Sequence, residues 1–511
     1  MKHHHFLFIA IMLTVFLSAV LTSAETTAAD IREPAVSGRF YPSDPEKLSS
    51  AIRHFLDEAV PAKGERPIAI AAPHAGYIYS GQICADAFRQ AADHKYDLIV
   101  LLGTNHSAPG FQGISVYPAG GYRTPLGVAE IDEKAAAALM DGGGDISFHK
   151  AAHEKEHSVE VMIPFVQTLF PGAKILPAIV GTDDPETCED FGKKLAEVIR
   201  TRSALIVSST DLSHYPAYED AVTTDRNTLE AMISMNPASL NEIIRKQEKK
   251  GISNLSTCAC GQAPIMAAMS AAKALGANCG RIISYANSGD ASVGNRDRVV
   301  GYGALMFTAS EHCTGQIPEP FVQESDKPAD LNDAQKKSLL NFARKTIAQY
   351  LDSETVPLAR GFDRQLWYKQ GAFVTLKKHG DLRGCIGHMA EDRPLCQVVG
   401  EMALNAAFQD RRFRPLAAPE LPQCEIEISV LTPFREVTGP EQILVGRDGV
   451  LIRKDGRSAV FLPQVAPEQG WNRDQMLEHL CQKAGLESDA WKEDTRFFTF
   501  QANVFSEHEF K

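Results

Sequence analysis

Apolar runs alternate with amphipathic, helix-like stretches through the first part of the chain. Five of the runs have the length and composition of buried strands, and they cover residues 68–71, 98–102, 175–180, 204–207 and 281–285. Strands that alternate with helices are typical of a mostly parallel sheet covered by helices. The pattern therefore predicts an α/β first domain that extends to residue 308.

The pattern changes after a polar stretch that contains proline, residues 309–333, which has the character of an interdomain linker. One helix is expected over residues 334–351, and strands dominate after it. Two Asp-Gly pairs lie between alternating apolar segments, which favours hairpin turns and predicts a three-stranded meander over residues 441–465. We expect an α+β second domain over residues 334–511.

The first 24 residues have the layout of a secretory signal peptide. Lys2 is the only formal charge before Glu25, residues 6–21 are almost entirely apolar, and the small residues Ser23 and Ala24 follow. This run of sixteen residues is shorter than the roughly 20 that a membrane-spanning helix needs. We expect cleavage near Ala24, export to the periplasm or the extracellular space, and no membrane span in the mature chain.

The net charge argues against nucleic acid as a partner, and the cysteine spacing argues against a disulfide framework. The chain has 52 basic and 64 acidic residues and a net charge of −12. An acidic surface repels phosphate backbones, so nucleic acid is not an expected partner. The ten cysteines are irregularly spaced, and a chain of this size does not need them as staples. We therefore predict no disulfide framework, although some cysteines could pair in an oxidising compartment.

Three of the predicted strands end in loops that carry ionisable side chains. His74 follows the first strand, His106 follows the second, and Asp211 and His214 follow the fourth. Because ligands bind at the carboxyl ends of strands in open parallel sheets, we expect these side chains to converge on one edge. Imidazole is the commonest metal ligand and also serves as a general base. A lone histidine is more often structural, so the argument depends on three of them at equivalent strand ends.

Cys260 adds a second type of ligand. It directly precedes an alanine-rich helix that is expected to run to about residue 275. A thiol at a helix N-terminus is stabilised as the thiolate, and thiolates bind iron, copper and zinc. Cys258 could be a further ligand, but ordinary packing is the interpretation that we favour for it.

His153 and His157 fit the pattern H-E-x-x-H, in which a helix places two zinc ligands beside a catalytic glutamate. That mechanism requires residues 153–157 to be helical, whereas the apolar positions give a helical period only after Ser158. A zinc peptidase is therefore the less favoured alternative. His157 and Glu160 could still reach the edge of the site.

Six spaced segments resemble the Memo family. In chain order over about residues 33–308 they are APHAGYIYSG, GTNH, EHSVEVMIPF, SSTDLSH, CGQAPI and SGD followed by VVGYGA. The fold of that family resembles the class III extradiol dioxygenases (the LigB-like fold), which hold non-haem iron with two histidines and a carboxylate. The resemblance implies that His74, His106 and Cys260 are metal ligands, with Cys260 in place of the carboxylate. It gives His214 an acid–base role with Asp211 as its neighbour.

Replacing a carboxylate by a thiolate softens the site, so ring cleavage does not follow from the resemblance. What the resemblance implies is Fe(II) or copper, with zinc possible, and a redox or dioxygenase-like activity on dioxygen or a small organic substrate. The alternative is a non-catalytic module that binds a ligand or a protein, with the metal structural or absent. Metal content, and its loss on His74→Ala, would separate the two.

The second domain contains the hexapeptide LRGCIG, followed by His388. Its two glycines suggest a tight turn that holds Cys385 near Arg383, and a neighbouring cation favours a nucleophilic or metal-binding thiolate. A buried small side chain is the plainer interpretation, and the residue types alone favour it slightly.

With GAFVTL before it and QDRRFRPL and EIEISVLTP after it, the hexapeptide resembles the AMMECR family over about residues 335–508. That family has no established activity, so Arg383, Cys385 and His388 are candidate site residues only. Memo-like and AMMECR-like domains recur together, often with a radical-SAM protein, a partner that an exported chain would not meet. We expect the second domain either to cover the site of the first or to supply Cys385 to it.

Overall fold

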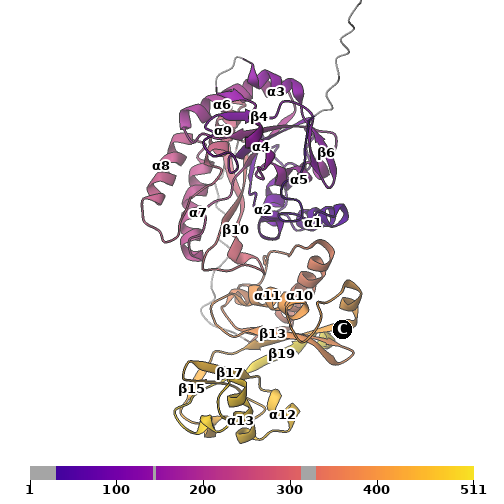
Figure 1. Cartoon of the computed structure of the whole chain (residues 1–511), viewed down its shortest axis with the longest axis vertical. Helices are drawn as coiled ribbons and strands as arrows, with labels where there is room; N and C mark the ends of the chain where they lie inside the picture. The colour runs from indigo at the N-terminus through magenta and orange to yellow at the C-terminus, as the bar shows by residue number, and fades with distance from the viewer. Residues whose placement is uncertain (1–29, 142–144, 312, 314–329, 511) are drawn as a thin grey trace, which may run out of the picture.

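The computed structural model describes residues 30–141, 145–311, 313 and 330–510. The expected signal peptide and most of the expected linker lie outside these residues. A larger first domain and a smaller second domain follow one another along the long axis of the molecule (Figure 1). Within the described part of the chain, no helix combines the length and the apolar composition that crossing a membrane requires.

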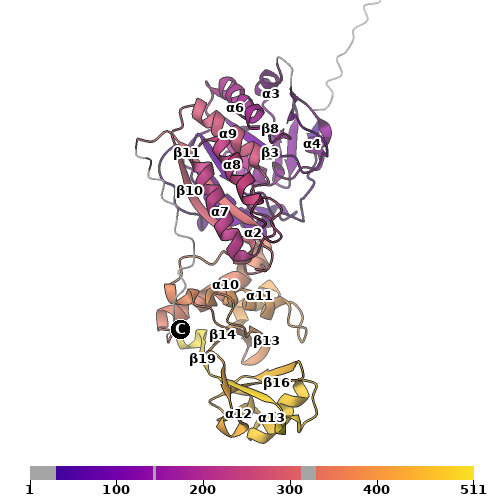
Figure 2. The ribbon, with the colours of Figure 1, turned by 90° about the vertical axis from the view of Figure 1, so that its left-hand side faces the viewer.

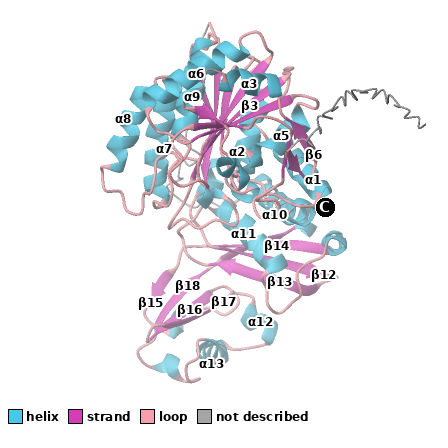
Figure 3. Cartoon of the chain, turned by 45° about the horizontal axis from the view of Figure 1, so that its top comes forward, coloured by secondary structure: helices cyan, strands magenta, loops and turns pink. Residues whose placement is uncertain are grey.

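An eight-stranded sheet forms the centre of the first domain (Figure 3). In spatial order its strands are β10 (Cys279–Asn287), β11 (Gly301–Thr308), β2 (Ala69–Ala72), β9 (Ala204–Ser209), β3 (Leu98–Thr104), β8 (Lys174–Val180), β4 (Ile114–Val116) and β7 (Ile146–Ser147). The five predicted strands are β2, β3, β8, β9 and β10. All residues of β2 and β3 are buried, because helices cover both faces, and this explains their continuous apolar sequence.

The sheet is mixed, which corrects the prediction of a mostly parallel one. Strands β2, β9, β3 and β8 are parallel neighbours. Strand β11 is antiparallel to both β10 and β2, and β4 is antiparallel to β8. The chain returns from β10 to β11 through residues 288–300 without a crossover helix, and such a short return gives antiparallel pairing.

Helices pack on both faces of this sheet (Figure 1). One layer contains α6 (Pro185–Ile199), α7 (Tyr218–Ile233), α8 (Pro237–Glu248) and α9 (Gln262–Ala274). The other contains α1 (Pro45–Asp57), α2 (Tyr77–Arg89) and α5 (Ile163–Leu169). The remaining elements are α3 (Glu133–Met140), α4 (Lys150–Glu154) and a small sheet of β1 (Ile31–Arg32), β5 (Gly121–Thr124) and β6 (Gly127–Glu130).

The second domain contains two four-stranded antiparallel sheets. The first consists of β13 (Asp381–His388), β12 (Ala372–Lys378), β14 (Cys424–Leu431) and β19 (Ala502–Ser506). The second consists of β15 (Arg435–Val437), β18 (Arg496–Phe500), β16 (Gly449–Lys454) and β17 (Arg457–Phe461). Its helices are α10 (Asp333–Ser353), α11 (Leu395–Phe408), α12 (Val465–Gln469) and α13 (Arg473–Lys483), so it is richer in helix than the sequence suggests.

The predicted meander is wrong in one strand. Asp455 and Gly456 form the turn between β16 and β17, both with positive φ, as a two-residue hairpin requires. The described residues 441–448 form no strand, and the other neighbour of β16 is β18, which comes much later in the chain.

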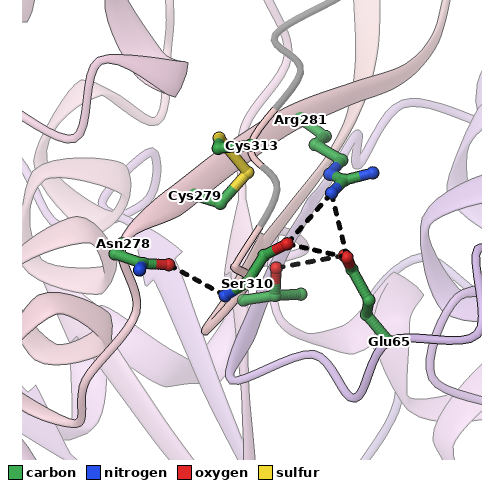
Figure 4. Close-up of a disulfide and its surroundings, with 7 residues drawn as sticks. Glu65, Asn278, Cys279, Arg281, Ser310 and Cys313 are labelled. Carbon is green, nitrogen blue, oxygen red and sulfur yellow. Dashed lines mark hydrogen bonds and ion pairs between the residues drawn. A yellow bond between two sulfur atoms is a disulfide. The ribbon is translucent and has the colours of Figure 1, made fainter.

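A disulfide joins Cys279, at the start of β10, to Cys313 (Figure 4). This bond was not predicted, because the irregular spacing of the cysteines gives no information about which of them pair. The two residues meet because the antiparallel register places Cys279 opposite Thr308, near the end of β11. Beside the bond, Ser310 and Arg281 both hydrogen-bond Glu65 at 2.9 Å, so the exit of the chain from the first domain is fixed.

Helices α10 and α11 lie between the first domain and the sheets of the second (Figures 1 and 2). Helix α10 packs against α1. The contacts across this interface include a bidentate ion pair in which Arg360 binds the buried carboxylate of Asp86 at 2.9 and 3.1 Å. Asp352 accepts hydrogen bonds from Ser50 and His54 of α1.

Candidate metal centre

Three histidines meet at the carboxyl end of the parallel part of the sheet. His74 follows β2, and His106 follows β3, the strand on the other side of β9. His157 comes from the segment after α4. Its ring lies 5.4 Å from that of His74 and 4.6 Å from that of His106, while the rings of His74 and His106 are 5.2 Å apart. One ring nitrogen from each of the three lies within 4.8 Å of the other two.

Hydrogen bonds at Nδ1 leave Nε2 as the nitrogen with which His74 and His106 could bind a metal. Ser209 donates its only hydroxyl hydrogen to the carbonyl of Ser158 at 2.6 Å, so it accepts from Nδ1 of His74 at 2.7 Å. His106 directs Nδ1 at the Glu156 carboxylate, 2.9 Å away. Such partners fix the tautomer of a ligating histidine. Burial lowers the pKa of His74 well below its ordinary value, so the ring stays neutral.

Glu156 connects the loop after β3 to the segment that carries His157. Its carboxylate accepts the backbone N–H groups of His106 at 2.7 Å, His157 at 2.9 Å and Ser158 at 2.8 Å. Burial alone would raise its pKa, but the hydrogen bond from His106 and the charges of His106 and His157 outweigh burial and lower the pKa to about 2. Glu156 is therefore ionised and orients two of the three imidazoles. The sequence analysis missed it.

A second group shares His74 with Cys260 and Asp211. The sulfur of Cys260 lies 3.2 Å from Nε2 of His74, and one ligand atom from each of the three residues lies within 4.8 Å of the others. Asp211 accepts the backbone N–H of His74 at 2.7 Å, and its own N–H donates to the Cys260 sulfur at 3.3 Å. His106 and Cys260, predicted as ligands of one ion, belong to different groups that meet at His74.

The expected thiolate at Cys260 is not what this environment favours in the metal-free protein. Helix α9 begins at Gln262, and the thiol is buried beside Asp211. Burial and the Asp211 carboxylate raise the pKa of Cys260 well above its ordinary value. Burial also raises the pKa of Asp211, to about 7.

His214 lies next to these groups without belonging to either. It forms an isolated bridge with Val300, the residue directly before β11. Its Nε2 is buried and has no hydrogen-bond partner among the described residues. Burial, aided by the charge of His106, lowers the pKa of His214 to about 4, so near neutral pH it is a neutral imidazole with an unused nitrogen.

The zinc peptidase interpretation is wrong because His153 and His157 do not share a helix. Helix α4 ends at Glu154, so His157 lies beyond it. His153 points into the protein, where its two ring nitrogens contact the Tyr122 hydroxyl at 2.7 Å and the Ser115 hydroxyl at 2.9 Å.

Glu160 and Cys258 also lie outside the site. Glu160 is fully buried and accepts hydrogen bonds from Arg32, from the Tyr41 hydroxyl at 2.6 Å and from two backbone N–H groups. Cys258 is buried in the hydrophobic core, and burial raises its pKa to about 12. Ordinary packing accounts for it.

The LRGCIG hexapeptide lies within strand β13 and is not a turn. Its glycines are explained by close packing: a Cβ on Gly384 would lie 2.1 Å from the carbonyl oxygen of Ala406 in α11, and one on Gly387 would lie 2.2 Å from the ring of Phe373. Neighbouring side chains of a strand point to opposite faces, so Cys385 points away from α11 and from the first domain. The second domain does not supply Cys385 to the metal centre.

The surroundings of Cys385 do not favour a thiolate. Thr375 donates to its sulfur at 3.2 Å, and burial raises its pKa above the ordinary value. Arg383 is engaged by the Glu420 carboxylate at 3.1 Å and by the backbone of Arg414. At the end of the strand, His388 binds the carboxylate of Asp392 at 2.6 Å.

Protein-family models match two separate parts of the chain: the model described as Memo-like protein matches residues 32–306, and AMMECR1 matches residues 340–505. A MEMO1 family protein from Methanopyrus kandleri is 35% identical over 288 residues, which cover 54% of this chain and 98% of that protein. A MEMO1 family protein from Aquifex aeolicus is 37% identical over 281 residues, 54% of this chain and 99% of that protein. Among solved structures, an uncharacterized protein from Pyrococcus horikoshii is 36% identical over 35% of this chain and 93% of its own, with a TM-score of 0.34.

Proposed function

This chain belongs to the Memo family and continues into an AMMECR1 region, and on that basis we propose that it is a metal-dependent redox protein. The proposed cofactor is Fe(II) or copper, with zinc as the other ion that these ligand types accept. The proposed substrate is dioxygen or a small organic molecule, and the proposed fold of the first domain is the LigB-like one.

The observation that carries the proposal is the convergence of three imidazoles, two of which, His74 and His106, use Nδ1 for other hydrogen bonds and keep Nε2 as the ligand nitrogen. The donor set fits a metal ion, because one ring nitrogen from each of His74, His106 and His157 lies within 4.8 Å of the other two. The Cys260 sulfur lies 3.2 Å from Nε2 of His74 and offers a further ligand atom. Imidazole suits iron, copper and zinc, and a thiol adds preference for the softer ions. A bound iron or copper ion would supply the electron-transfer chemistry that the side chains lack.

The chain's own residues would hold and orient the reactants. Glu156 and Ser209 fix the rings of His106 and His74. His214 keeps a neutral ring with a free Nε2, so it would accept a proton from a substrate bound beside it. Asp211 holds the backbone of His74 in place.

The test is the metal content of residues 25–511 purified without chelators. We expect stoichiometric iron or copper in the wild type and its loss in His74→Ala, because this residue belongs to both groups. The control is His94→Ala, which should retain the metal because His94 precedes β3 and belongs to neither group. His157→Ala and Cys260→Ala then show which group holds the ion. If the wild type carries no metal and takes up neither Fe(II) nor Cu(I), the redox proposal fails, and the first domain is a ligand-binding scaffold.

We also propose that the protein is exported, with residues 1–24 removed. The Cys279–Cys313 disulfide supports this, since such bonds persist in oxidising compartments. An exported protein would act on small molecules and would not meet a cytoplasmic radical-SAM partner. N-terminal sequencing of the protein from periplasm and medium should begin at Glu25, and recovery of only uncleaved protein in the cytoplasm would contradict the proposal.

A further inference from the structure

The second domain contacts the chain segment that supports His214. From this contact we propose that Gln397 of α11 is a positioning residue for the metal centre, acting through Asp290 and residues 288–300, the return segment. The proposal depends on the proposed function for the chemical role of His214, whereas the path of contacts stands on the structure alone.

The path begins at a buried hydrogen bond between the domains. The Gln397 amide donates to the carboxylate of Asp290 at 3.0 Å, and each residue is 6% exposed. Asp290 lies at the beginning of the return segment and also accepts from the Tyr218 hydroxyl at 2.7 Å and the backbone N–H of Asn287 at 2.8 Å. A buried carboxylate needs such donors, so removing the amide leaves one oxygen under-satisfied and favours movement of the segment.

Close packing reinforces this contact. A Cβ on Gly400, one turn along α11 from Gln397, would lie 2.5 Å from the hydroxyl oxygen of Ser292. Ser292 belongs to the return segment and is buried. The helix of the second domain therefore presses directly on the segment, and the absence of a side chain at position 400 permits the approach.

The return segment in turn holds the chain around His214 by backbone hydrogen bonds. His214 itself bridges to Val300. Within the return segment, Val299 accepts from the N–H of Tyr215 (2.7 Å) and donates to the carbonyl of Pro216 (2.9 Å), and the carbonyl of Arg296 accepts from the N–H of Tyr218 (3.0 Å). Directly after it, Gly301 of β11 accepts from Leu212 (2.8 Å) and donates to Ser213 (2.9 Å).

The conformation next to His214 shows that this support is needed. Tyr215 has a φ of 74°, in the left-handed region that bulky residues rarely adopt. Strained conformations persist only where the surroundings determine them. Here the Val299 carbonyl holds the N–H of Tyr215, and the Arg298 guanidinium lies 4.9 Å from the centre of the Tyr215 ring. The backbone of His214 itself pairs with Thr257 and Ser256, at 3.0 Å each, while the return segment holds its neighbour Tyr215. The return segment, and through Asp290 also Gln397, therefore contributes to the place of the His214 ring.

The test uses residues 25–511 with labelled histidine, and NMR resonances of the imidazoles are assigned with His214→Gln. In Gln397→Leu we expect the His214 resonance to move by more than its line width and trypsin to cleave after Arg298 several-fold faster. The matched control is Arg360→Met, which breaks another buried interdomain contact, with Asp86, away from the return segment. In that variant the His214 resonance should stay in place.

An unchanged His214 resonance in Gln397→Leu would overturn the proposal, and so would an equal shift in both variants, which would indicate general loosening of the interface. Should Gln397→Leu fail to fold, Gly400→Ala pushes on Ser292 from the same helix and is expected to move the same resonance; no shift there would overturn the proposal equally. The readout needs no metal. If the protein binds no metal, the proposed function fails, but the NMR result still decides whether Gln397 positions His214.

Discussion

Breaking the Cys279–Cys313 disulfide should destabilise the first domain by about 4 kcal/mol. The bond joins residues that are 34 apart in sequence. In the chain-entropy model, a cross-link over a loop of that length restricts the unfolded chain by about 4 kcal/mol. With an unfolding entropy of about 2.1 cal/mol/K per residue over roughly 280 residues, this corresponds to a fall of about 7 °C in Tm.

Cys313→Ser is the cleaner variant, because Cys313 is exposed whereas Cys279 is fully buried and its replacement would also disturb packing. Differential scanning calorimetry of residues 25–511 should show the lower Tm in the variant. Reductant should lower the wild-type Tm to the same value and leave the variant unchanged. A variant that melts with the oxidised wild type would refute the reasoning from loop entropy.

Two further predictions concern packing and pH. Gly384→Ala should destabilise the second domain by about 1–3 kcal/mol, because its Cβ would meet the Ala406 carbonyl. Urea unfolding should show a smaller loss of stability for Cys385→Ala, because Cys385 points away from α11. Equal losses of stability in the two variants would contradict the packing argument. Burial lowers the pKa of His153 from 6.5 to about 3, so below pH 6.5 His153 is protonated in the unfolded chain but not in the folded protein. The free energy of unfolding should therefore fall as the pH is lowered from 6.5 to 3, and it should fall less steeply in His153→Gln. The same slope in both proteins would exclude His153 as its source.

The central strands of the first domain could be predicted because burial on both faces produces continuous apolar runs. The directions of the flanking strands could not, since they depend on which strands become neighbours. Strand β11 returns beside β10 and then pairs with β2, far away in sequence. The disulfide was missed for the same reason: Cys279 and Cys313 are brought together by that register and not by their spacing.

In the candidate site, the two histidines that follow strands could be predicted from the sequence, and the third could not. His74 and His106 come together because parallel strands place their carboxyl ends on one edge. His157 does not follow a strand, and its position depends on Glu156, which binds the backbone of the loop after β3. The E-H pair at the end of HEKEH contained the signal, but the H-E-x-x-H pattern draws attention to Glu154, and only the tertiary contacts of Glu156 reveal its orienting role.

The two candidate ligand groups differ in whether they must release a proton to bind a metal ion, and this difference can show which group holds the ion. In the imidazole group, burial lowers the pKa values of His74 and His157, the latter to about 4, so these two rings are already neutral near neutral pH. Cys260 holds its proton near neutral pH, since burial raises its pKa well above the ordinary value. A thiol must lose its proton to bind a metal. Calorimetric titration with Zn²⁺ in buffers of different ionisation enthalpy should therefore show release of about one proton per ion if Cys260 is a ligand. Proton-free binding, retained in Cys260→Ala, would assign the ion to the three histidines and set aside the thiolate that the sequence predicts.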